Sequence, residues 1–168
     1  DYTYNLKKNL PKLETNKIEI NKITKFIKNK TIISAISTHS GEEKIFLEKF
    51  LFLRKRIKNL ILFIQPRHPE RREEIKKLIK DYKLEFSVKS KRIYPIHNTE
   101  VYLFDTFGES GNLIEVSDII ILGGTFVPVG GHNLIEPAKF GKCIISGEYT
   151  SKINDTVDEF KKNKAIVL

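Results

Sequence analysis

The sequence predicts an α/β protein built on a Rossmann-like, doubly wound parallel sheet. Short apolar runs alternate along the chain with segments whose apolar residues recur at three- and four-residue spacing, which favours parallel strands joined by helices. The apolar runs are continuous and do not alternate with polar residues, as expected of strands buried on both faces. A length of 168 residues with 40% hydrophobic and 30% charged residues fits one globular domain.

The elements follow in order along the chain. Residues 1–30 are polar and rich in Lys and Asn, and they predict an incoming linker with one helix over 18–28. Residues 31–168 are expected to form the ligand-binding domain. The predicted strands are 31–37, 60–65, 101–104, 118–122, 143–146 and 165–168, and the predicted helices are 42–56, 72–81, 156–162 and two short ones after Gly108 and Asn133. The last strand has no helix after it and the sequence has no Met, so we expect a piece of a longer chain whose domain is truncated at its C-terminal end.

The composition limits the classes of function. Cys143 is the single cysteine, which excludes an internal disulfide and indicates a reducing, cytoplasmic setting; its place in an apolar strand predicts a buried, inert thiol. No apolar run approaches the roughly 20 residues needed to span a bilayer. The net charge of +9 fits nucleic acid, an anionic membrane surface or an anionic small substrate. No aromatic residues interleave with the lysine clusters as base stacking requires, so we expect no nucleic-acid partner.

Ligands of doubly wound sheets bind at the carboxyl ends of the strands, near the point where the strand order reverses. The loop after the first strand contains Thr38 and His39 and opens a helix, so its amides form a possible anion site. The alternative is a capping box in which Ser40 is the N-cap and Glu43 reaches back to it. Taken alone, this loop favours the capping box.

The loop after the second strand places Arg67 at the strand's end, where its planar fork suits a phosphate or a carboxylate. Arg71 and Arg72 are expected on the solvated face of the following helix. The loop after the third strand contains Gly108, which permits a close backbone approach, followed by Glu109.

The richest loop runs from Gly123 to Pro137 and contains two Gly pairs before a helix. Two Gly pairs cost backbone entropy, which argues against a plain connector. Asn133 and Glu136 have the spacing of a capping box, and Glu136 is equally placed to accept both hydroxyls of a ribose.

Other chemistries fit poorly. The sequence has neither G-x-x-x-x-G-K-[ST] nor G-x-G-x-x-G, the common phosphate- and dinucleotide-binding patterns. Its histidines, His39, His68, His97 and His132, lie far apart without a zinc spacing. We therefore expect no metal and no cofactor.

Four segments in this order and spacing resemble the bacterial 3-deoxy-D-manno-octulosonic acid (Kdo) transferase family. They are Ser-Thr-His-Ser-Gly-Glu-Glu from Ser37, Pro-Arg-His-Pro-Glu-Arg from Pro66, Asp-Thr-Phe-Gly-Glu from Asp105, and Gly-Gly from Gly123 followed by Gly-Gly-His-Asn-Leu-Ile-Glu-Pro from Gly130. Near the start, Asn5, Leu6 and Lys7 also resemble the segment by which these enzymes enter their C-terminal domain. Phe107, Ser110 and Gly111 depart from the small or apolar pattern expected at those positions.

The resemblance implies a GT-B glycosyltransferase, with two Rossmann-like domains facing each other across a cleft, of which this chain is the C-terminal, donor-binding half. It implies a metal-independent, inverting transfer of Kdo from CMP-Kdo to a lipid A precursor, in lipopolysaccharide biosynthesis at the cytoplasmic face of the bacterial inner membrane. The general base, the acceptor site and a membrane-associating segment belong to the N-terminal domain, so we expect this chain alone to be inactive.

The resemblance also implies roles for individual residues. Arg67 and the amides of Gly123, Gly124 and Thr125 contact the phosphate or the Kdo carboxylate, and Glu136 with Asn133 holds the ribose. Gly108 and Glu109 line the cytosine side, and Thr38 with His39 forms the floor of the cleft. The alternatives are a GT-B donor domain for a UDP-sugar, a nucleotide sensor, and a non-catalytic basic module that binds nucleic acid or membrane.

Overall fold

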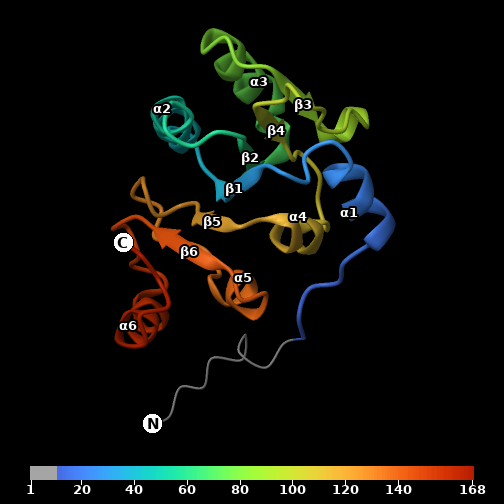
Figure 1. Cartoon of the computed structure of the whole chain (residues 1–168). Helices are drawn as coiled ribbons and strands as arrows, with labels where there is room; N and C mark the ends of the chain where they lie inside the picture. Colours follow the sequence, from blue (N-terminus) through green and yellow to red (C-terminus); the bar gives the residue numbers. More distant parts are fainter. Residues whose placement is uncertain (1–10) are drawn as a thin grey trace.

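The computed structural model describes residues 11–168, so the resemblance at residues 5–7 lies outside the described part. Its centre is a six-stranded sheet in the order β3-β4-β2-β1-β5-β6, in which every pair of neighbouring strands is parallel (Figure 1). The strands are β1 (Thr31–Thr38), β2 (Leu60–Pro66), β3 (Phe86–Val88), β4 (Val101–Leu103), β5 (Ile119–Leu122) and β6 (Cys143–Ser146). The predicted doubly wound parallel sheet is confirmed.

Helices cover both faces of the sheet (Figure 1). They are α1 (Lys17–Thr24), α2 (Glu42–Leu53), α3 (Arg72–Asp81), α4 (Ser110–Val116), α5 (Ile135–Lys139) and α6 (Asn154–Lys162). One core cluster joins the sheet to α2 and α3, through side chains such as Phe46 and Ile75. The other joins the sheet to α1, α4 and α6, through Ile23, Leu113 and Val157. The helix predicted in the incoming segment thus packs on the sheet as part of the core.

Two strand predictions were wrong. The strand expected at 165–168 is a single parallel bridge between Val167 and Ile145. Strand β3 was missed because it has only three residues, with the polar Ser87 in the middle, and pairs with β4 alone at the edge of the sheet. A three-residue edge strand needs no continuous apolar run, so it leaves little trace in the sequence.

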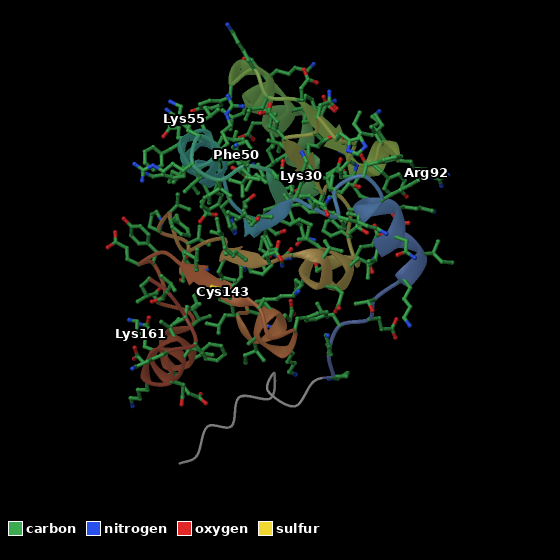
Figure 2. All side chains as sticks on the ribbon, in the orientation of Figure 1. Lys30, Phe50, Lys55, Arg92, Cys143 and Lys161 are labelled. Atoms are coloured by element: carbon green, nitrogen blue, oxygen red, sulfur yellow. The ribbon has the colours of Figure 1, made fainter. Side chains whose placement is uncertain are left out.

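Cys143 was expected to be buried, and the structure corrects this: its side chain is exposed. Cys143 is the first residue of β6, which forms the other edge of the sheet, so no neighbouring strand lies on its outer side (Figure 2). The apolar residue that follows, Ile144, is buried as predicted.

The strand order reverses between β1 and β5. From β1 the chain proceeds to β2 on one side, and from β5 it proceeds to β6 on the other. The connections leaving the carboxyl ends of β1 and β5 therefore diverge, which opens a crevice at this end of the sheet. Within residues 11–168, no helix is both long and apolar enough to cross a membrane.

Candidate functional site: a crevice where the strand order reverses

A crevice of about 420 Å³ opens at the carboxyl ends of the central strands. The loops after β1, β2, β5 and β6 supply its walls. Its polar lining residues are Ser37, Arg67, His132, Asn133, Glu136 and Lys152. Three residues predicted from the sequence, Arg67, Asn133 and Glu136, thus meet in one cavity.

Glu42, the first residue of α2, fixes the glycine-rich loop behind the crevice. Its side chain is fully buried, and its carboxylate accepts four backbone N–H groups. The donors are the amides of His39 at 2.8 Å, Gly124 at 2.8 Å, Thr125 at 3.2 Å and Phe126 at 3.0 Å. One carboxylate therefore holds the loop after β1 and the loop after β5 together. No local pattern in the sequence signals this role, since the position of Glu42 predicts only the start of a helix.

The amides of this loop have partners within the fold. The resemblance implied that the N–H groups of Gly123, Gly124 and Thr125 contact the phosphate or the Kdo carboxylate, and this role stays a prediction. Two of them donate to Glu42, and that of Gly123 donates to the carbonyl of Ile36 at 2.8 Å. Gly123 serves close packing, since a Cβ there would lie 2.3 Å from the carbonyl oxygen of Ser37.

The capping box expected at the start of α2 was wrong. The N-cap is Gly41, whose φ of 95° favours glycine, and no side chain caps the helix there. Glu43 is buried and accepts the hydroxyl of Thr38 at 2.6 Å and the guanidinium of Arg71 at 2.8 Å. Thr38 thus supports the site from within and does not line the crevice, and Arg71 is held in an ion pair where a solvated side chain was expected.

Asn133 and Glu136 interact through their side chains, but the capping box was wrong, because the N-cap of α5 is Leu134. The Asn133 amide donates to the Glu136 carboxylate at 3.0 Å, and its oxygen accepts the N–H of Ile135 at 3.1 Å. Asn133 therefore accepts the first N–H group of α5 and fixes the Glu136 carboxylate in the crevice wall. A carboxylate held in this way is suited to accept two adjacent hydroxyls.

Three histidines that are distant in the sequence gather beside the crevice. The Nε2 atoms of His39 and His132 lie 2.6 Å apart, and the His39 ring lies 6.0 Å from that of His68. Burial, together with the nearby His39, Arg67 and Lys152, lowers the pKa of His132 from its ordinary 6.5 to about 4. Burial also lowers the pKa of His39, against the attraction of Glu42. Both rings are neutral at pH 7. Among residues 11–168, no group of three His, Cys, Asp or Glu side chains is arranged to hold a metal ion.

The low pKa of His132 predicts an acid-sensitive fold. Because the folded chain protonates His132 only near pH 4 and the unfolded chain near 6.5, stability is lost as the pH falls between these values. We expect the melting temperature of His132→Asn to fall less over this window than that of the unsubstituted chain, in scans at matched ionic strength. Melting curves that shift in parallel would show that His132 does not contribute to the acid sensitivity.

Gly108 and Glu109 lie apart from these residues, after β4 and on the far side of β2. The Glu109 carboxylate accepts the hydroxyl of Thr106 at 2.7 Å and pairs with the buried Lys89 at 3.1 Å. Neither Gly108 nor Glu109 lines the crevice. Their expected role on the base side stays a prediction.

Two of the three unusual residues near Gly108 have structural roles. A Cβ on Gly111 would lie 2.1 Å from the carbonyl oxygen of Glu14, so only glycine lets α4 approach the incoming segment. Ser110 accepts the side-chain amide of Gln65 at 2.9 Å. Phe107 is 72% exposed, and the structure gives no reason for its size.

Known proteins similar to this chain include curated transferases and a solved domain. No protein-family model matches the chain. It is 38% identical over 142 residues to the 3-deoxy-D-manno-octulosonic acid transferase of Haemophilus influenzae, covering 82% of this chain and 33% of that protein. It is 33% identical over 156 residues to the transferase of the same name from Rickettsia felis, covering 93% of this chain and 33% of that protein.

The solved structure of the C-terminal CMP-Kdo binding domain of WaaA from Acinetobacter baumannii superposes with a TM-score of 0.84. It is 27% identical to the chain and covers 89% of this chain and 79% of its own. The chain spans about a third of the length of the curated relatives it matches. In sequence and fold, the chain is similar to the C-terminal domain of the Kdo transferases.

Proposed function

We propose that this chain binds the donor CMP-Kdo in the crevice between the β1 and β5 connections. The observation that carries the proposal is the meeting of Arg67, Asn133 and Glu136 in one cavity at the point where the strand order reverses. The similarity to a solved domain that is described as binding CMP-Kdo supports the choice of donor. Arg67 meets the phosphate through its fork, and Glu136, fixed by Asn133, accepts the ribose hydroxyls.

The phosphate contact follows from the distribution of charges. Arg71, Arg72 and Lys89 are paired with Glu43, Asp105 and Glu109, so their charges are largely balanced within the fold. Arg67 has no carboxylate within ion-pair distance among residues 11–168, and Lys152 has none either. These two cations give the crevice a positive potential that suits an anionic donor.

The reaction of the whole protein is part of the same proposal. The hydroxyl of a lipid A precursor attacks the anomeric carbon of Kdo with inversion, and CMP leaves as Arg67 stabilises the charge that develops on its phosphate. No metal is required for this step, because the cation is supplied by the protein. The acceptor site and the general base lie outside this chain, which alone binds the donor without transferring Kdo. The basic surface favours work at the anionic cytoplasmic face of the inner membrane.

A chemical-shift titration tests the proposal. We expect CMP to shift the amide signals of Arg67, His132, Asn133 and Glu136, and UMP and UDP to bind more weakly. The signals of residues 54–58, in the turn after α2 at the opposite end of the sheet, serve as the internal control. Tighter binding of UDP than of CMP would indicate a UDP-sugar donor. Signals that shift with RNA oligonucleotides but not with mononucleotides would indicate a nucleic-acid-binding module.

A further inference from the structure

The crevice has a second cation that the sequence analysis did not find. We propose that Lys152 recognises the carboxylate of a sugar acid while Arg67 holds the phosphate, so that Lys152 selects acidic over neutral sugar donors. This inference rests on the proposed function and deepens it.

The two glycines before His132 position Lys152. The Lys152 N–H donates to the carbonyl of Gly130 at 3.0 Å, and a Cβ on Gly130 would lie 2.9 Å from the Cγ and 3.2 Å from the Cδ of Lys152. The next residue, Ile153, lies over Gly131 in the same way, at 2.7 Å from a Cβ built there. Residues 152–153 therefore pack directly on Gly130 and Gly131, where a larger side chain would collide with them. The aliphatic part of Lys152 runs over Gly130, and Lys152 lines the crevice.

The placement of the two cations favours a ligand with two separate anionic groups. Arg67 follows β2 and Lys152 follows β6, so they reach the crevice from opposite sides of the β1 and β5 connections. His132 lines the same cavity as both cations. Among residues 11–168, neither cation has a carboxylate within ion-pair distance. Glu136 lines the same cavity, but its carboxylate accepts the side-chain amide of Asn133.

A nucleotide-activated sugar acid has this charge pattern, with one charge on the phosphodiester and one on the carboxylate. A donor with a neutral sugar and a single phosphate has no carboxylate for Lys152. The Lys152 ammonium then forms no ion pair with the sugar and adds nothing to the affinity. A nucleoside diphosphate also has two charged groups, but they are adjacent. Lys152 therefore distinguishes donors by the group beyond the phosphate.

The test compares two ligands that share the cytidine phosphodiester, namely freshly prepared CMP-Kdo and the ethyl ester of CMP, which lacks the carboxylate. Lys152→Met keeps the length of the stem and removes the charge, Lys152→Arg keeps the charge, and Lys161→Met removes one exposed lysine from α6 as the matched control (Figure 2). Dissociation constants are measured by calorimetry on the whole chain, and melting temperatures establish that each variant is folded.

We expect Lys152→Met to weaken CMP-Kdo about 10-fold and the ethyl ester less than about 2-fold, with Lys152→Arg within about 3-fold of the unsubstituted chain for both. Equal losses for both ligands, or no loss for either, would overturn the inference and leave the proposed function intact. If the unsubstituted chain binds neither cytidine ligand, the proposed function fails and the inference fails with it.

Discussion

Glu42→Ala is expected to lower the free energy of unfolding by about 4 kcal/mol, the largest stability loss of any single change considered for the site. The substitution leaves four backbone N–H groups, three of them in the glycine-rich loop, without their acceptor in a fully buried position. Each orphaned buried donor costs about 1–3 kcal/mol, and partial access of water reduces the sum. Urea unfolding followed by circular dichroism measures the loss.

Glu42→Gln separates the loss of acceptors from the loss of volume. The amide keeps one acceptor oxygen and turns its own N–H groups toward backbone donors, so we expect about 2–3 kcal/mol of destabilisation with the same side-chain size. Glu73→Gln is the matched control, because that side chain is 72% exposed and pairs only with Lys76 on the same helix. It should leave the stability essentially unchanged, because an exposed ion pair contributes little. Losses for Glu42→Gln as small as those for Glu73→Gln would show that the loop does not depend on this carboxylate.

The central strands were predictable because burial on both faces leaves little choice of residue. Strands β1, β2 and β5 lie in the middle of the sheet, and a polar side chain there needs a partner of its own, as Ser34 has in Ser117 at 2.5 Å. A continuous apolar run is the direct result, so these strands were expected within a residue or two of where they occur. At the edges this constraint weakens, which is why β3 was missed and Cys143 was misjudged.

The candidate site was predictable only where it depends on residues near each other in the chain. Asn133 and Glu136 are only three residues apart, so their contact at the start of α5 is a local one. The partners of Glu42 are 82 to 84 residues away in the glycine-rich loop, and His39 meets His132 over a separation of 93 residues. Such contacts depend on how β1 and β5 are aligned, and no local spacing in one sequence encodes that register.

Arg67→Ala is expected to weaken CMP binding about 50-fold, the largest loss of affinity from one side chain. A guanidinium bonded to phosphate contributes about 2–3 kcal/mol, and 1.4 kcal/mol corresponds to a factor of ten. The backbone of Arg67 is fixed independently of its side chain, because its N–H donates to the carbonyl of Thr38 at 2.9 Å and ties the end of β2 to that of β1. The variant therefore removes the fork and keeps the position of the chain.

Arg67→Lys keeps the charge and loses the two-pronged geometry, so we expect an intermediate loss of about 5- to 10-fold. Calorimetry at several salt concentrations adds a second readout, since CMP binding should weaken with salt less steeply in Arg67→Ala than in the unsubstituted chain. Arg56→Ala is the matched control: its guanidinium lies 4.7 Å from the ring centroid of Phe52, in the turn after α2 at the opposite end of the sheet. If Arg67→Ala and Arg56→Ala bound CMP equally well, Arg67 would not contact the phosphate, and Lys152 would be the remaining cation among the residues that line the crevice.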